Sequence, residues 1–329
     1  MHVMNVDRIL YLIRTYSWLC KAWALPFTPE YKIQAPIFLL GTQGGGLTLL
    51  SRILRRHPSA ISVAGNNDYW TSADELANAF GLFLPFEFAG LRYKAPSHPV
   101  LTAPRSWTYA SKELLPQYRK TASDANNELK RKLIRAIRFA IMLHGNDKEN
   151  CRFVDKSQST TLRVGFFYEL LKEYDPRFVL VTRNPYAAIY RAANGKAGDI
   201  RRLSNKLCYE ERVRICTEHY MNSVRAVFED AKLQGIPIHI VQFEQILEKP
   251  ERTVRRVCEF VDLDFSRDML PNPDHCFPLG SRFKGRWWPL RVDVNSAYIE
   301  AIEDWVIEKV NSIGEDLIYK LGYEVLGRR

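Results

Sequence analysis

Short apolar runs alternate with amphipathic segments along most of this 329-residue chain. Runs bounded by polar residues, glycine or proline predict buried strands at residues 37–40, 60–63, 152–155, 177–182 and 236–241. Apolar residues at helical spacing predict helices at 49–54, 124–144, 162–174, 210–232, 251–261 and 296–321. This alternation predicts one α/β domain over residues 1–329, with a parallel sheet of about five strands flanked by helices.

The clearest predicted helix runs from Asp124 to His144 and is followed by Gly145, a typical helix stop. Its apolar face carries Leu129, Leu133, Ile137 and Ile141. Basic residues between 130 and 138 occupy the rest of its circumference. We expect them to form a solvated face, and the alternative is a binding face for an anionic molecule.

A glycine-rich loop, Gly41 to Gly46, lies between the first predicted strand and the first helix. Glycine lets successive backbone N–H groups turn toward an anion, and the helix N-terminus adds its dipole. The spacing matches the nucleotide phosphate loop G-x-x-x-x-G-K-[ST] except that Leu47 replaces the lysine. That lysine contacts the β- and γ-phosphates, so Leu47 argues against triphosphate chemistry. The alternative is a turn that only lets the helix pack on the strand.

Polar residues follow the predicted strands, at the edge where parallel α/β sheets bind ligands. Lys156 comes directly after the strand at 152–155, and Arg183 directly after the strand at 177–182. Pro185 is placed to begin the next helix. The basic, glycine-containing stretch 191–206 is predicted to be either a mobile loop over this edge or a plain connector.

Composition and charge narrow the class of partner. The sequence is 46% hydrophobic and 26% charged, which is typical of a globular domain, and its net charge of +10 predicts an anionic partner or a generally basic surface. Six cysteines show neither C-x-x-C pairs nor metal-ligand spacing, so neither disulfides nor a metal site is indicated. Reduced thiols suit a cytoplasmic protein, which is the expected location.

The N-terminal segment 1–34 is predicted to be amphipathic. Residues 9–25 are apolar but interrupted by Arg14 and Lys21, which makes them too short and too charged for a membrane-spanning helix. They also lack the small-residue cleavage site of a signal peptide. We expect a helix that packs on the domain, and the alternative is peripheral membrane contact through this segment.

Taken together, these blocks resemble the sulfotransferase family, which transfers a sulfuryl group from 3′-phosphoadenosine 5′-phosphosulfate (PAPS). The likeness covers 36–61, 152–191 and 236–265, and more loosely 282–288 and 321–324. It implies a P-loop-like fold whose glycine loop holds the 5′-phosphosulfate, while the 3′-phosphate lies against basic residues. The positions that would bind the cofactor are Gln43, Gly44, Gly45, Gly46, Leu47, Thr48, Leu49, Arg183, Arg191, Arg282, Lys284 and Gly285.

Several departures from the family pattern affect the catalytic residues. The family commonly has a loop lysine or arginine where this chain has Gly44, and its 3′-phosphate serine falls on Arg191, which would supply a second cation. Its two kinds of base, histidine and glutamate, fall on Gln158 and Asn66. Because in-line transfer needs a cation and a base, we expect Lys156 as the catalytic cation, with Lys284 second. We expect Asp68 as the base, and the alternative is a turn or helix-cap aspartate.

The resemblance implies a PAPS-dependent sulfotransferase that moves the sulfuryl group to a hydroxyl, or less often an amine, of a small molecule or carbohydrate. The product would be 3′-phosphoadenosine 5′-phosphate (PAP), with no metal required and no nucleic-acid partner. Residues 71–150 would form a helical insertion on the acceptor side, and 271–290 a C-terminal loop at the cofactor and substrate. The alternatives are a catalytically silent nucleotide-binding protein and, less favoured, a P-loop kinase. The sequence fixes neither the acceptor nor the oligomeric state.

Overall fold

The computed structural model describes residues 30–62, 76, 87–89, 92–94, 100, 108–196, 200, 207–272, 276–279, 283–286 and 290–328. Asp68, Asn66, Arg282 and the segment 9–25 lie outside these residues. Among the described helices, none is long and apolar enough to cross a membrane.

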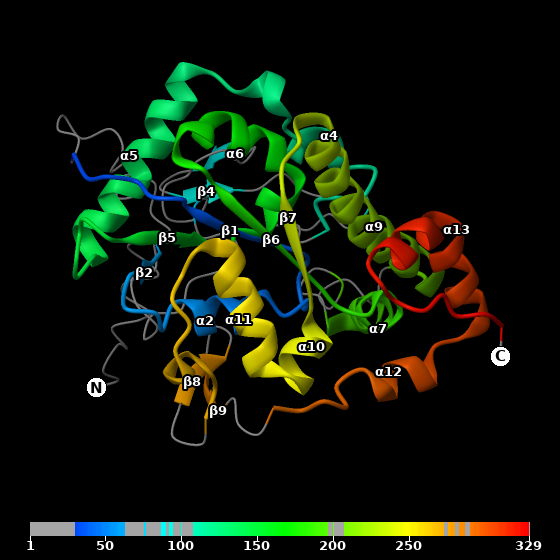
Figure 1. Ribbon diagram of the computed structural model, residues 1–329. Helices are drawn as coiled ribbons and strands as arrows, with labels where there is room; N and C mark the ends of the chain where they lie inside the picture. The colour runs from blue at the N-terminus through cyan, green and yellow to red at the C-terminus, as the bar shows by residue number, and fades with distance from the viewer. Residues whose placement is uncertain are drawn as a thin grey trace, which may run out of the picture.

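The centre of the fold is a five-stranded parallel sheet with the strand order β2-β5-β1-β6-β7 (Figure 1). Its strands are β1 (Ile37–Leu40), β2 (Ala60–Ile61), β5 (Arg152–Asp155), β6 (Arg177–Thr182) and β7 (Ile238–Gln242). The order places β1 in the middle, where Ile37 is in register with Val154 of β5 and Arg177 of β6. The α/β class and the parallel sheet predicted from the sequence are therefore confirmed.

The helices cover both faces of this sheet (Figure 1). The α-helices of the described residues are α2 (Leu47–Leu54), α4 (Leu115–Tyr118), α5 (Asn127–His144), α6 (Val164–Leu171), α7 (Pro185–Arg191), α9 (Tyr209–Gln234), α10 (Phe243–Glu248), α11 (Pro250–Val261), α12 (Ser296–Ala301) and α13 (Asp304–Lys320). Helices α5 and α6 lie on one side, and α2 and α11 on the other.

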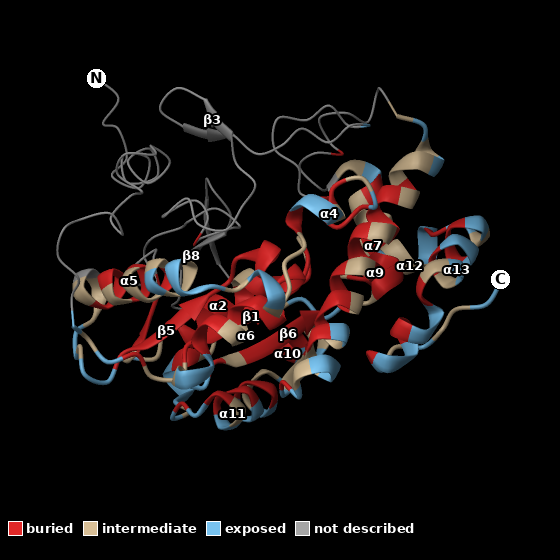
Figure 2. Ribbon diagram, turned by 90° about the horizontal axis from the view of Figure 1, so that it is seen from above, coloured by how far each residue is buried: buried red, intermediate tan, exposed pale blue. Residues whose placement is uncertain are grey.

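Side chains of β1 alternate between two hydrophobic cores. Phe38 and Leu40 belong to the core that contains residues of α5, α6, α9 and α13, whereas Ile37 and Leu39 belong to the core with α2 and α11. This alternation follows from the pleat, which turns successive side chains to opposite faces. Phe38 packs against Phe178, with ring centroids 5.4 Å apart. The central strands are buried throughout (Figure 2), which explains why they are continuous apolar runs in the sequence.

Helix α5 shows why the amphipathic pattern is informative. The Asn126 side chain accepts a hydrogen bond from the Leu129 N–H at 3.0 Å, so it caps the first turn. Leu133, Ile137 and Ile141 are buried as expected, and the helix ends at Gly145. Lys130 and Lys132 form ion pairs with partly exposed glutamates. These two residues therefore lie on the solvated face that the sequence predicted.

Three segments differ from the sequence-based expectation. The predicted final helix is wrong as a single element, because Ile302 and Glu303 are extended and separate α12 from α13. Buried Ile302 anchors the break, and the Glu303 carbonyl accepts the first N–H bonds of α13. The segment 162–174 is helical only in part, with 3₁₀ turns on either side of α6. The stretch after Arg191 continues as a π-helical turn, Ala192–Lys196.

Two segments expected to be helix or loop contain short hairpins. Within 71–150, β3 (Glu87–Ala89) pairs with β4 (Arg92–Lys94), so this region is not wholly helical. Within 271–290, β8 (Cys276–Leu279) pairs with β9 (Phe283–Arg286), which places Lys284 and Gly285 on a strand. Strands this short carry too little periodicity to be recognised in the sequence.

Candidate functional site: an anion cradle at the carboxyl edge of the sheet

The glycine loop joins β1 to α2 at the carboxyl edge of the sheet. Gly44 and Gly46 have φ angles of +82° and +97°, a conformation that side-chain-bearing residues rarely adopt. Thr161 fixes the start of the loop: its hydroxyl accepts a hydrogen bond from the Gly41 N–H at 2.8 Å and donates one to the Gly41 carbonyl at 3.2 Å. The loop is therefore tied to the segment that follows β5.

Several backbone N–H groups in this loop have no acceptor among the described residues. They belong to Gln43, Gly44, Gly46, Leu47 and Thr48. Two other loop amides are already used, since the Gly45 N–H donates to the Thr42 carbonyl and the Leu49 N–H to the Gly46 carbonyl. A run of unpaired N–H groups at a helix N-terminus is the donor set that binds phosphate and sulfate groups. Leu49 thus stabilises the helix start rather than offering a free donor.

The side chains after the loop point into the protein. Leu47 is 4% exposed and Leu49 is 6% exposed, and both belong to the hydrophobic core with α11. Leu47 therefore cannot act as the phosphate-binding lysine does in triphosphate-hydrolysing loops. Thr48, between these two leucines, is only half-buried.

Arg183 follows β6 and ties the loop to the C-terminal part of the chain. Its Nη1 donates to the Gly44 carbonyl at 3.1 Å, its Nε to Asn295 Oδ1 at 2.7 Å and its Nη2 to the Val294 carbonyl at 3.0 Å. A guanidinium has five N–H donors, so within the described part of the chain one N–H on each terminal nitrogen has no acceptor. Burial, followed by the nearby positive charge of Arg191, lowers the pKa of Arg183, while Glu244 partly offsets both.

Glu244 accepts hydrogen bonds from several polar groups next to Arg183. One carboxylate oxygen accepts the Asn184 N–H at 2.8 Å and a hydrogen bond from the Asn295 amide. The other accepts the Tyr323 hydroxyl at 2.9 Å. Burial raises the pKa of Tyr323, so its hydroxyl keeps its proton and serves as a donor. This network holds Asn295 where it can accept from Arg183.

Lys156 and Gln158 lie on the other side of the loop, directly after β5. Lys156 is 5% exposed and Gln158 is 7% exposed. The turn that carries them is held by Asp155, which accepts hydrogen bonds from the Ser157 N–H at 3.0 Å and the Ser157 hydroxyl at 2.8 Å. Gln158 Oε1 is buried and has no hydrogen-bond partner among the described residues. Since β5 and β1 are neighbours, this turn flanks the glycine loop.

A small cavity of about 20 Å³ lies beneath the loop and between α7 and α9, with room for about one water. Gln43 and His219 both line it, and within the described chain neither Gln43 Oε1 nor His219 Nε2 has a hydrogen-bond partner. His219 Nδ1 accepts the Ala110 N–H at 3.2 Å, so the ring proton is on Nε2. Burial lowers the pKa of His219 to about 3, which leaves the ring neutral and a poor proton acceptor at pH 7.

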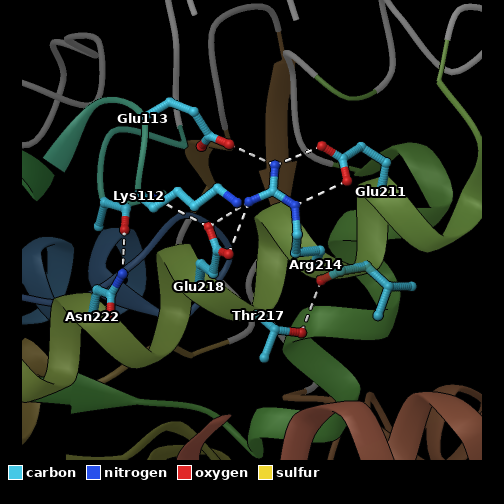
Figure 3. Close-up of polar contacts among 9 residues, drawn as sticks. Lys112, Glu113, Glu211, Arg214, Thr217, Glu218 and Asn222 are labelled. Carbon is cyan, nitrogen blue, oxygen red and sulfur yellow. Dashed lines mark hydrogen bonds and ion pairs between the residues drawn. The ribbon is translucent and has the colours of Figure 1, made fainter. Parts of the chain in front are cut away.

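Arg214 on α9 holds the segment 108–118 against this part of the site (Figure 3). Its guanidinium contacts Glu113 at 2.6 Å, Glu211 at 2.6 Å and Glu218 at 2.8 Å. These contacts, led by the hydrogen bond to Glu211, raise the pKa of Arg214. The cluster thus ties α9 to the segment that contains Thr108, which lines the same cavity as Gln43.

Replacing Arg214 by methionine should destabilise the fold, because it leaves carboxylates in a largely buried cluster without their cation. We expect a loss of about 2–4 kcal/mol in the free energy of unfolding at pH 7. A matched control is Lys172→Met, because Lys172 contacts Glu169 on the surface and its loss should leave the unfolding midpoint unchanged. Urea unfolding of the three proteins measures both effects.

The stability lost in Arg214→Met should depend on pH, because Arg214 changes the pKa values of its carboxylate partners. The hydrogen bond from Arg214 lowers the pKa of Glu211, and for Glu113 hydrogen bonds from its own backbone and from Arg214 outweigh the effect of burial, which acts in the opposite direction. A carboxylate whose pKa is lower in the folded than in the unfolded protein stabilises the fold at pH values above the ordinary pKa of 4.5. This stabilisation is lost as the pH falls through the folded-state pKa. The gap between wild type and Arg214→Met should therefore narrow below pH 4.5. A constant gap would contradict this assignment.

The structure brings the loop, Arg183 and Lys156 together at one edge of the sheet, as the sequence led us to expect. It describes only the backbone of Lys284 and Gly285. Sequence reasoning missed Asn295, Tyr220 and His219. No local pattern marks them, because they come from distant segments and act through contacts made only in the fold; for instance, the Tyr220 hydroxyl donates to the Arg183 carbonyl at 2.7 Å.

The fold is that of an α/β protein with a P-loop-like glycine loop between β1 and α2. The chain belongs to the sulfotransferase family, whose model matches residues 36–267. No curated protein matches the sequence.

Solved structures of sulfotransferases share this fold, and two of them illustrate the likeness. One is a sulfotransferase domain from the curacin biosynthetic pathway, with 15% identity, a TM-score of 0.51 and coverage of 90% of this chain and 100% of that one. The other is the sulfotransferase STF1 from Mycobacterium tuberculosis, with 16% identity, a TM-score of 0.50 and coverage of 91% and 86%.

Proposed function

We propose that this protein transfers a sulfuryl group from PAPS to a hydroxyl or amine of a small-molecule or carbohydrate acceptor. The observation that carries this proposal is the set of unpaired backbone N–H groups in the loop, joined through the Gly44 carbonyl to Arg183. The loop donors suit a phosphosulfate, and the free N–H groups of Arg183 suit a second phosphate nearby. PAPS carries both groups on one nucleotide.

The roles of the chain's residues follow from their positions. The N–H groups of residues 43, 44 and 46–48 would hold the 5′-phosphosulfate, with the Thr48 hydroxyl as a further donor. Arg183 would hold the 3′-phosphate through the N–H groups left free by its contacts with the protein. When bound, PAPS supplies the sulfuryl group. Lys156, buried beside the loop, would stabilise the negative charge that develops during transfer.

The base that accepts the proton from the acceptor is proposed to be Asp68, which lies outside the described residues. His219 is a poor alternative because burial lowers its pKa to about 3. Among the described residues, Gln158 occupies the position of the family histidine, and an amide cannot take up a proton at pH 7. Arg282, Lys284 and Gly285 are further proposed cofactor contacts from the C-terminal segment.

Arg183→Ala tests the assignment of the 3′-phosphate. We expect its affinity for PAP to fall by about 10- to 150-fold, the value of a charged hydrogen-bonded contact of 1.5–3 kcal/mol. Affinity for AMP, which lacks the 3′-phosphate, should fall much less. Isothermal titration calorimetry with both nucleotides and with Mg²⁺–ATP gives the comparison. Equal losses for PAP and AMP would contradict the contact, and a wild type that prefers Mg²⁺–ATP to PAP would favour a kinase instead.

We also propose a reducing, cytoplasmic setting. Within the described residues Cys151, Cys208, Cys216 and Cys258 are free thiols. Burial raises the pKa of Cys258 to about 11, so this thiol stays protonated and unreactive at neutral pH.

A further inference from the structure

The segment 183–191, which contains α7, contacts Gly44 from both of its ends. At one end, Arg183 donates to the Gly44 carbonyl at 3.1 Å. At the other end, Arg191 places its guanidinium against the Gly44 Cα: a Cβ added to Gly44 would lie 2.5 Å from Arg191 Nη1 and 3.5 Å from its Cζ. Arg191 therefore occupies the space that a side chain at position 44 would fill. The glycine and the arginine are sterically coupled, since neither a lysine nor an alanine fits at 44 while Arg191 lies there.

The surroundings leave the charge of Arg191 available to a ligand. Within the described ranges Arg191 has no hydrogen-bond or ion-pair partner, and its side chain is only half-buried. Glu244, the nearby carboxylate, is already used by the Asn184 N–H, Asn295 and Tyr323. The guanidinium groups of Arg183 and Arg191 therefore lie close together at Gly44, and their positive charges repel each other. An anion bound at the loop would relieve this repulsion.

We propose that Arg191 binds the 5′-phosphate and supplies from helix α7 the positive charge that the loop lacks at Gly44. This deepens the function proposed above and rests on it. Sulfuryl transfer breaks the bond between sulfur and the 5′-phosphate oxygen, and the electron pair stays on that oxygen while the acceptor oxygen or nitrogen forms the new bond to sulfur. The proton of the acceptor goes to the base. Arg191 neutralises the charge left on the phosphate, opposite Lys156 on the β5 side of the loop.

This assignment differs from the expectation that Arg191 acts on the 3′-phosphate, and the two positions can be separated by binding. The ligands are AMP with only the 5′-phosphate, adenosine 3′-monophosphate with only the 3′-phosphate, and PAP with both. Arg191→Ala should lower the affinity for AMP and for PAP by about tenfold or more. It should change the affinity for adenosine 3′-monophosphate by less than about twofold. Arg191→Lys, which keeps the charge, should retain most of the affinity for AMP.

Calorimetry on wild type and both variants shows which phosphate Arg191 contacts. Thermal unfolding confirms that each protein is folded. Loss of affinity for adenosine 3′-monophosphate with AMP unchanged would overturn the proposal, as would unchanged affinity for all three ligands. Either result would leave PAP binding by the wild type, and with it the proposed function, intact. A wild type that binds none of the three ligands would instead remove the proposed function and this inference together.

Discussion

Lys156→Ala is expected to slow sulfuryl transfer by about 10²- to 10³-fold, the usual effect of removing one preorganised charge or donor from a transition state. Lys156 is 5% exposed and lies directly after β5, whose neighbour β1 carries the glycine loop. A cation in this position is shielded from water, so its interaction with a developing negative charge is stronger than it would be on the surface. Transfer rates from PAPS measure the effect.

A structural role for Lys156 would give a different result. Lys156→Arg keeps the positive charge and should retain much more of the rate than Lys156→Ala. The PAP affinity of both variants should remain close to that of wild type, because the interaction with the developing charge forms fully only during transfer. Thermal unfolding checks that each variant is folded. If Lys156→Ala lowered the unfolding temperature and left the rate per folded molecule unchanged, the catalytic assignment would be wrong.

Gly46→Ala is expected to destabilise the loop and weaken PAP binding together. Gly46 has a φ of +97°, and a Cβ there would overlap the Phe243 ring. Phe243 in turn packs on Arg183, whose guanidinium carbon lies 5.4 Å from the ring centroid. Strain and the displaced ring should cost about 2–4 kcal/mol in the free energy of unfolding. The shift of Phe243 against Arg183 should lower the PAP affinity by at least about tenfold.

Gly235→Ala is a control that separates backbone strain from the overlap with Phe243. Gly235 also has a positive φ, +65°, but a Cβ there would meet nothing within 4 Å. Alanine at this position should therefore cost about 1–2 kcal/mol of backbone strain and leave PAP binding unchanged. Urea unfolding and calorimetry on both variants provide the comparison. Equal effects of the two substitutions would mean that the Phe243 contact contributes nothing.

The parts of the fold that the sequence predicts are those determined by local pattern. Buried parallel strands are short apolar runs, and β6 gives the strongest strand signal in the sequence, with Pro176 directly before it. The break between α12 and α13 was not predictable in this way. It contains neither glycine nor proline, and it exists because Ile302 is drawn into the core. Short hairpins such as β3–β4 leave equally little trace in the sequence.

In the candidate site, too, the sequence predicts the residues set by local pattern and misses those set by long-range contacts. The glycine loop and Arg183 were predictable, since a strand, a turn and a helix start define them within a few residues. Asn295 was not, because it meets Arg183 across a separation of 112 residues. The pairing of Gly44 with Arg191 was also hidden. The sequence shows a missing loop cation and an unexpected arginine as separate departures, and only the packing of α7 against the loop joins them.

The most direct test of the proposed function is the transfer of label from sulfur-labelled PAPS to a mixed library of hydroxyl and amine acceptors. The account predicts labelled product in at least one acceptor with release of an equal amount of PAP, and a much slower transfer by Lys156→Ala. Tight PAP binding with no labelled acceptor and no PAP release would contradict it, and would identify the protein as a nucleotide-binding member of the family without transfer activity.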